Sequence, residues 1–418
     1  MKKLIISIFT TFILLNNCVL PQNIYALENP SAKPNNIYGI HILDENDLED
    51  AARLVNSSGG DWGYITLVIR YDEIDVKRWQ NLFDKMRRLH LIPIVRIATT
   101  QVDSHWEKPK PDQIDNWVSF LSSLNWVIKN RYVIIGNEPN HASEWGGDLN
   151  PQEYADHLYT LSDKLKKESE SFFVLPAGFD ASAPSDKTHM SEVEFLKKML
   201  EHKPGVFDNI DGWCSHSYPN PNFSGSENDR GRGTIATYEW ELELLKSLGV
   251  EKEFPVFITE TGWAHNQYNQ TLGYKNPDTI SQSLIFAYKN VWTDKRIVAV
   301  TPFVLNYNNP PLDIFSWRKK DGGFYNFYYD VERIPKVAGR PFQEVKAKLL
   351  SFVFPPVIKR KGKFYGIAFV KNEGQSIWNW GEFVNPFDGG VDIQYIPLLF
   401  FFNGEPGQKS LAIIRVGS

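Results

Sequence analysis

The stretch Tyr132–Asn140 reads YVIIGNEPN, an apolar run that ends in a glycine, a glutamate and a proline. A short, continuously apolar run is typical of a strand that is buried on both faces. The glycine and the proline predict that the chain turns where this strand ends. Val256–Trp263 reads VFITETGW and has the same form. Each stretch therefore places one carboxylate, Glu138 or Glu260, where a predicted strand opens into a loop.

Runs of the same kind recur along the chain and alternate with amphipathic stretches. The predicted strands are Ile37–Leu43, Tyr64–Arg70, Ile92–Ala98, Tyr132–Gly136, Phe172–Ala177, Ile210–Ser215, Val256–Thr259 and Val298–Leu305. The predicted helices are Val76–Leu89, Gln113–Ile128, Tyr154–Lys167, Ser191–His202, Ile235–Leu248 and Thr279–Val291. Alternating strands and helices predict an α/β fold, a parallel (β/α)8 TIM barrel, with a doubly wound open sheet as the competing arrangement. No GxGxxG or GxxxxGK[ST] loop follows a strand, which weakens the nucleotide-binding form of that alternative.

The two ends of the chain differ from the repeat. Lys2 and Lys3 precede the apolar run Leu4–Leu15, which predicts a signal peptide over residues 1–26 and a secreted or cell-envelope protein. An uncleaved anchor is the alternative, and no membrane-spanning segment is predicted in the mature chain. Residues 27–350 form the predicted barrel domain. Residues 351–418 form a predicted small β-rich C-terminal region, with strands at Phe364–Lys371, Val391–Phe402 and Leu411–Val416.

Composition limits the classes of partner. The 418 residues carry 45 Lys and Arg against 50 Asp and Glu, without a long basic run, so nucleic acid is not an expected partner. Aromatic residues make up 14% of the chain, which suits a protein that stacks sugar rings. Of the two cysteines, only Cys214 lies outside the predicted signal, within an apolar strand. We therefore expect a buried, inert thiol and no intramolecular disulfide.

Two glutamates at strand ends suit one reaction in particular. In a (β/α)8 barrel the carboxyl ends of the strands form a common rim, so Glu138 and Glu260 are expected to meet there. Hydrolysis of a glycosidic bond needs one carboxylic acid to protonate the leaving oxygen and a second, ionised carboxylate beside the sugar carbon. The sequence thus predicts a glycosidase, an enzyme that acts on carbohydrate.

The chain resembles clan A glycoside hydrolases in its Asn-Glu-Pro motif after the fourth strand and its Thr-Glu-Thr-Gly-Trp motif after the seventh. The resemblance implies a retaining enzyme that cleaves O-glycosidic, β-linked bonds of oligo- or polysaccharides by double displacement. It implies Glu138 as the acid/base, Glu260 as the nucleophile and Asn137 as a partner of the sugar 2-hydroxyl. In the clan, an arginine on an early strand and a Tyr or His after the sixth strand steady the nucleophile. The matching residues here are Arg70, which we rank first, Arg96 and Tyr218.

Further substrate-binding candidates follow from their places at strand ends or in the loops after them. His216 ends the sixth strand and His41 lies near the end of the first. Loop tryptophans can cover the apolar face of a sugar, with Trp263 and Trp317 preferred over Trp106 and Trp145. The remaining candidates are Asn306 and the long loop of residues 220–233. The chain departs from the clan at its eighth strand, which lacks a terminal tryptophan, and Trp317 is expected to take that place.

Three other functions remain as alternatives. A non-catalytic glycan-binding protein of the cell surface could keep the aromatic cleft of a glycosidase-like barrel. A metal-dependent hydrolase is disfavoured because the sequence contains no HxH or HExxH motif, so neither a metal nor another cofactor is predicted. A serine esterase is disfavoured because no GxSxG motif occurs.

Overall fold

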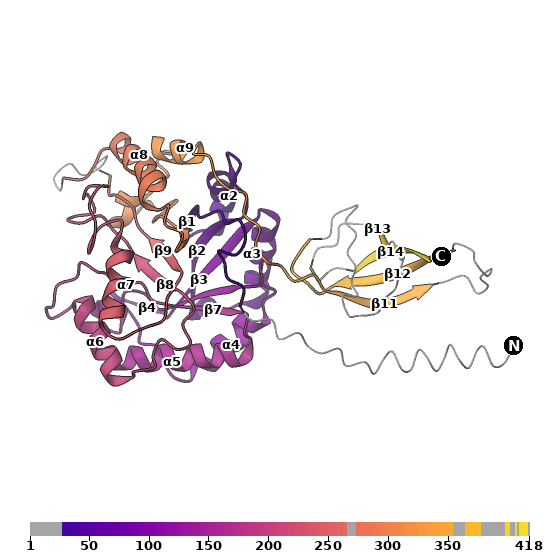
Figure 1. The fold of residues 1–418 in the computed structure, drawn as a ribbon, viewed down its shortest axis with the longest axis horizontal. Coiled ribbons are helices and arrows are strands. Elements are labelled where there is room, and N and C mark those ends of the chain that lie inside the picture. Colours follow the sequence, from indigo (N-terminus) through magenta and orange to yellow (C-terminus); the bar gives the residue numbers. More distant parts are fainter. Residues whose placement is uncertain are drawn as a thin grey trace. The chain divides into compact units, whose positions relative to one another are not determined.

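The computed structural model describes residues 27–265, 273–353, 364–377, 398–401, 406–407 and 409–416. The predicted signal peptide, with Cys18, lies outside the described residues. The described chain forms two compact units (Figure 1). The larger unit comprises Leu27–Glu344 and Gly374–Ile377. No helix among the described residues is long and apolar enough to cross a membrane.

The larger unit is built on eight parallel strands. Five form one sheet in the order β1-β2-β3-β6-β7, and three form a second in the order β10-β9-β8. Their bounds are β1 Gly39–Ile42, β2 Gly63–Arg70, β3 Leu91–Ala98, β6 Arg131–Ile135, β7 Phe172–Pro176, β8 Trp213–His216, β9 Val256–Glu260 and β10 Ile297–Val300. Parallel bridges join the two sheets on both sides, between Tyr38 and Val300 and between Asp180 and His216.

Helices lie around the outside of these strands (Figure 1). They are α2 Leu48–Asn56, α3 Val76–Arg88, α4 Gln113–Ser123, α5 Pro151–Glu168, α6 Glu192–His202, α7 Thr237–Ser247, α8 Pro277–Phe286 and α9 Asn326–Glu332. Local sequence determines several helix starts. The side chains of Asn150 and Asn276 each accept a backbone N–H of the first turn, and each is followed by a proline at the first helical position.

The predicted parallel α/β architecture is confirmed, and every predicted strand overlaps an observed one. The doubly wound alternative is wrong, because the strands follow one another in sequence order and the order never reverses within a sheet. Helices α2 and α9 were not predicted. At nine and seven residues they are too short for helical periodicity to stand out from the surrounding chain.

The smaller unit contains an antiparallel sheet in the order β11-β12-β14-β13. Its strands are β11 Ala347–Val353, β12 Phe364–Asn372, β13 Leu398–Phe401 and β14 Lys409–Val416. The predicted strands at Phe364–Lys371 and Leu411–Val416 are thus observed. Much of the predicted strand at Val391–Phe402 lies outside the described residues.

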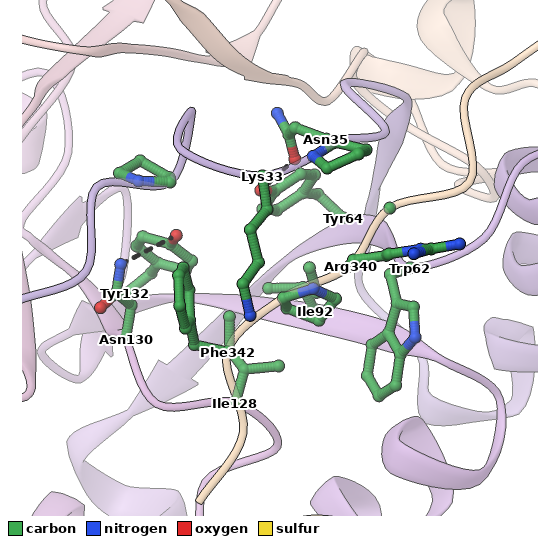
Figure 2. Close-up of a pocket in the computed structure, with 14 residues that line it drawn as sticks. Lys33, Asn35, Trp62, Tyr64, Ile92, Ile128, Asn130, Tyr132, Arg340 and Phe342 are labelled. Atoms are coloured by element: carbon green, nitrogen blue, oxygen red, sulfur yellow. Dashed lines mark hydrogen bonds between the residues drawn. The ribbon is translucent and has the colours of Figure 1, made fainter.

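The amino ends of the strands are closed by packed side chains. A cavity of about 20 Å³ there is lined by Tyr64, Ile92 and Tyr132 at the starts of β2, β3 and β6 (Figure 2). The Tyr64 hydroxyl donates to Asn35 at 2.7 Å, and the Lys33 ammonium lies 3.5 Å from the centre of the Phe342 ring. Because these polar groups are already paired, we assign this end a structural role.

Candidate active site

Glu138, Glu260 and His216 meet at the carboxyl ends of β6, β9 and β8. One carboxylate oxygen of each glutamate and one ring nitrogen of the histidine all lie within 4.8 Å of one another. Glu260 is the last residue of β9 and His216 the last of β8, whereas Glu138 follows β6 by three residues. The strand ends therefore bring together two carboxylates that are 122 positions apart in the sequence.

The backbone around Glu138 is tightly bent. Gly136 has a φ of +90°, which glycine adopts without steric cost, and Glu138 itself has a φ of +29°. A positive φ at a residue with a side chain is uncommon and costs energy, so the surrounding structure must hold it. The backbone N–H of Glu138 donates to the carbonyl of Gly178 at 3.0 Å, which ties this loop to the segment after β7.

His216 lies between the two carboxylates. Its side chain is 2% exposed, and Nδ1 lies 2.8 Å from Glu138 Oε1 and 3.9 Å from Glu260 Oε2. Burial opposes a positive charge on the ring, but attraction to Glu260 and Glu138 outweighs it and raises the pKa of His216 well above its usual value. The two carboxylates thus favour the positively charged form of the imidazole, whose Nδ1 lies within hydrogen-bond distance of Glu138.

Gly178 makes room for this histidine. A Cβ atom at position 178 would lie 2.2 Å from His216 Cδ2 and 2.5 Å from Nε2, far inside contact distance. We expect Gly178→Ala to displace the ring and break its bond to Glu138, lowering kcat by about 10–100-fold, because small misplacements of catalytic groups are costly. The measurement is kcat on the best glycoside substrate, with circular dichroism as a check of folding.

Gly323→Ala is the matched control, since the nearest atom to its added Cβ is a carboxylate oxygen 3.5 Å away. A folded Gly178→Ala variant with the kcat of the wild type would contradict the proposed role of this glycine.

Glu260 is surrounded by groups that favour its ionised form. The Tyr218 hydroxyl donates to Oε2 at 3.1 Å. Burial by itself would raise the pKa of Glu260, but the positive charges of His216 and Arg96 and the Tyr218 bond together lower it. His41 is buried nearby, and burial lowers its pKa to about 3, so its ring is neutral at neutral pH. Glu260 is thus held as a carboxylate.

A cleft of about 470 Å³ opens at this end of the strands and exposes both glutamates. One wall is aromatic: Phe223, Phe303 and Phe315 pack together with ring centres 5.0–6.0 Å apart where they touch. The other wall is polar and includes His141, whose Nε2 lies 3.0 Å from Asp180 Oδ2. The lining of the cleft therefore provides both apolar surface and hydrogen-bonding groups.

The structure brings several of the predicted residues to this site. Asn137, Arg96 and Tyr218 line the cleft with the two glutamates, and His216 and His41 lie buried against them. Trp106 also lines the cleft, and so do Asn220 and Phe223 of the loop over residues 220–233. Cys214 is buried, as expected.

Other predicted residues lie elsewhere. Arg70, which the sequence ranked above Arg96, forms ion pairs with Asp72 and Glu73 at 3.1 and 3.2 Å and does not line the cleft. Asn306 donates to Asp47 at 3.2 Å outside the cleft. Side chains that follow a strand can turn outward when a nearby acid captures them, and the sequence carried that signal for Arg70 in its two acidic neighbours.

The preferred tryptophans serve packing instead of lining the cleft. Trp317 is 3% exposed and packs edge-on against Phe327 with ring centres 5.2 Å apart. Trp263 is buried, and its indole N–H donates to the carbonyl of Gly225 at 2.8 Å. Trp145 is buried too. Phe303, three residues after the end of β10 and within the predicted eighth strand, does line the cleft.

Sequence reasoning missed two further carboxylates in the lining of the cleft, Asp180 and Glu144. Glu144 lies closer in sequence to Glu138. It ends the short 3-10 turn η3, Ala142–Glu144. Burial raises the pKa of Glu144 to about 7, and the negative charges of Glu138 and Glu260 act in the same direction, while Arg96 and the Asn137 amide oppose them. No pattern in the sequence marks this residue, because its place depends on how the loop after β6 folds back.

Glu138, His216 and Glu260 also form the one group of candidate metal ligands among the described residues. A cation at this place would have to displace the proton on His216 Nδ1, since only a deprotonated nitrogen binds metal. That proton is favoured by both neighbouring carboxylates. The donor set therefore suits a shared proton better than a metal ion.

No protein-family model matches the chain, and no curated protein matches it. Solved structures do match. They include a GH39 β-xylosidase from Caulobacter crescentus, at 12% identity and a TM-score of 0.49, over 93% of this chain and 98% of that one. A GH128 endo-β-1,3-glucanase from Sorangium cellulosum matches at 14% identity and a TM-score of 0.45, over 73% of this chain and 99% of that one. An endo-β-1,4-glucanase from Xanthomonas axonopodis matches at 15% identity and a TM-score of 0.45, over 71% of this chain and 98% of that one. All three of these solved structures are described as glycoside hydrolases.

Proposed function

We propose that the larger unit is a (β/α)8 barrel and a retaining glycoside hydrolase that cleaves β-linked sugars in an oligo- or polysaccharide. Glu260 is the nucleophile and Glu138 the acid/base. No cofactor takes part. The cleft supports a carbohydrate substrate, because its aromatic wall suits the apolar face of a sugar ring and its polar wall suits the hydroxyl groups.

In the first step a Glu260 oxygen attacks the anomeric carbon while the bond to the leaving oxygen breaks, and Glu138 gives that oxygen a proton. The Tyr218 hydroxyl and Arg96 steady Glu260 in its ionised form. In the second step Glu138 takes a proton from water, the water oxygen attacks the anomeric carbon, and the ester to Glu260 breaks. The proton that Glu138 takes from water restores its acid form for the next cycle. His216 Nδ1 lies 2.8 Å from Glu138 Oε1 and orients that carboxyl group.

One observation carries this proposal: a Glu138 oxygen and a Glu260 oxygen lie within 4.8 Å of each other. Retaining glycosidases hold their carboxyl groups about 5–5.5 Å apart, whereas inverting enzymes leave about 6.5–9.5 Å for a water molecule. The spacing here supports direct attack by Glu260.

The test is hydrolysis of a panel of aryl β-glycosides and β-linked polysaccharides, followed by NMR of the first product. We expect the β-anomer to form first and the α-anomer to appear only by later mutarotation. An initial α-anomer would overturn the retaining mechanism. Binding of glycans without hydrolysis of any substrate would instead support the non-catalytic, glycan-binding alternative.

A further inference from the structure

Two glutamates are buried where helices α6 and α7 pack outside the sheet. Glu192 is the first residue of α6, and Glu241 lies in the middle of α7. Neither residue exposes any surface. None of their four carboxylate oxygens has a hydrogen-bond partner among the described residues. An ionised carboxylate that is buried without a partner is very unfavourable, so such a group takes up a proton instead.

The two side chains lie behind β8, on the face of the strand that points away from the cleft. The charge of Glu241 acts on Glu192, and the side chains of Trp213 and Ser215 face Glu241. Because side chains alternate along a strand, Trp213 and Ser215 point to the face opposite to that of His216. The glutamates are therefore separate from the candidate active site, and the mechanism does not use them.

The charged groups around these glutamates do not neutralise them by direct contact. Arg232 and His216 attract a negative charge on Glu192, but the Arg232 guanidinium donates to the carbonyl groups of Ala181 and Ala183. His216 Nδ1 faces Glu138 on the other side of the strand. The start of α6 also favours an anion, whereas Asp180 opposes one. Two buried carboxyl groups thus lack a cation that touches either of them within the described chain.

Burial therefore acts strongly on both groups. It raises the pKa of Glu192 well above its usual value, and repulsion by Glu241 adds to this effect. Burial also raises the pKa of Glu241 to about 7, although Ser215, Trp213 and His216 favour its ionised form. A protonated carboxyl group donates one hydrogen bond and still accepts others, so two such groups can bond to each other.

We propose that Glu192 and Glu241 share protons as a hydrogen-bonded pair that fixes α6 and α7 against β8, and that loss of these protons at higher pH weakens this packing. The inference does not depend on the proposed glycosidase function. It makes the layer between β8 and the two helices a pH-sensitive part of the fold.

The sign of the pH effect follows from proton binding. A carboxyl group whose pKa is raised on folding binds more protons in the folded chain than in the unfolded chain. Its contribution to stability is complete below the ordinary glutamate pKa of 4.5 and is lost as the pH rises through the raised value. For Glu241 this loss extends to about pH 7, and for Glu192 it continues to higher pH.

The test is the Tm of the full chain between pH 5 and pH 9, measured by circular dichroism. The variant is Glu192→Gln combined with Glu241→Gln, because an amide has the shape of a protonated carboxyl group and does not ionise. Each single variant is measured as well. Glu243→Gln is the matched control, a change of the same type at an exposed position of α7.

We expect the Tm of the double variant, relative to that of the wild type, to increase by about 5 °C or more between pH 5 and pH 9. Other titrating groups are common to both proteins and cancel from this difference. Glu243→Gln should follow the wild type at every pH. A difference in Tm between the double variant and the wild type that stays constant with pH would overturn the inference.

Infrared spectroscopy gives a second test that does not depend on the stability of the double variant. The wild type at pH 6 should show the carbonyl stretch of a protonated carboxylic acid, and this band should be weaker in Glu192→Gln and in Glu241→Gln. Raising the pH to 9 should weaken the band of the wild type. Spectra of both single variants that match the wild type in this region, or a band that is unchanged at pH 9, would show that the pair does not hold and release protons.

Discussion

Replacing Glu260 with alanine is expected to lower kcat by about 10⁴–10⁶-fold, the largest effect of any single change in the cleft. Without the carboxylate there is no atom to form the covalent intermediate, although Glu138 can still protonate the leaving oxygen. The measurement is steady-state hydrolysis of the best aryl β-glycoside by purified protein. Glu251→Ala, a change of the same type at an exposed position, should retain the activity of the wild type.

Azide distinguishes loss of the nucleophile from loss of folding. In Glu260→Ala, azide can occupy the space that the carboxylate leaves and attack the anomeric carbon from the same side. We expect turnover to return with a glycosyl azide of inverted, α configuration as the product. Activity of Glu260→Ala that equals the wild type, or azide rescue with retained configuration, would show that Glu260 is not the nucleophile.

Replacing Glu138 with alanine is expected to produce a loss that depends on the leaving group. A leaving oxygen of high pKa needs protonation, so kcat/KM on an alkyl glycoside should fall by about 10²–10⁴-fold. A 2,4-dinitrophenyl glycoside needs no proton, and its first step should be nearly unchanged. The second step still lacks its base, so the glycosyl-enzyme should accumulate and release a burst of phenol before slow turnover.

For Glu138→Ala, too, the configuration of the product formed with azide tests the role of the residue. It attacks the glycosyl-enzyme in place of activated water, and the product should be a β-glycosyl azide of retained configuration. Opposite configurations from the two variants would therefore separate the two roles. Equal losses of Glu138→Ala on alkyl and dinitrophenyl glycosides, without a burst, would contradict the assignment of Glu138 as the acid/base.

The sequence predicted that Glu138 and Glu260 would meet because both signals are local. An apolar run followed by glycine or proline determines where a buried strand ends, and this information lies within a few residues of Glu138 and of Glu260. The order of the strands then places both ends on one rim. The same reasoning located His216 and Tyr218, because they end or follow the sixth strand.

It was harder to predict which arginine would line the cleft, because both candidates lie far from Glu260 in the sequence. Val68 of β2 lies opposite Arg96 of β3 in the sheet, and Arg70 lies opposite Ala98, so the two arginines differ by one pleat in their height above the cleft. In the sequence, Arg70 ends the second predicted strand, whereas Arg96 lies two residues before the end of the third. Only the packed structure shows that Arg96 lines the cleft, where its charge acts on Glu260, while Arg70 pairs with acids beside it.

The sequence also could not show which aromatic residues line the cleft and which belong to the core. The sequence showed an excess of them, and it indicated loops in which tryptophans could meet sugar. Hydrophobic burial makes no distinction between a ring that fills the core and a ring that covers a substrate. The sequence therefore favoured Trp263 and Trp317 over Trp106, whereas tertiary packing buries the first two and leaves Trp106 at the cleft.

By itself, then, the sequence determined the parallel α/β architecture, the strand ends and the two glutamates that meet there, because strand periodicity and turn chemistry act over a few residues. The tertiary structure decided which cation faces Glu260, how Gly178 makes room for His216, and that Glu144 joins the cleft. These features depend on contacts between residues far apart in the chain, and the relative heights and orientations of such residues follow only from sheet register and loop packing.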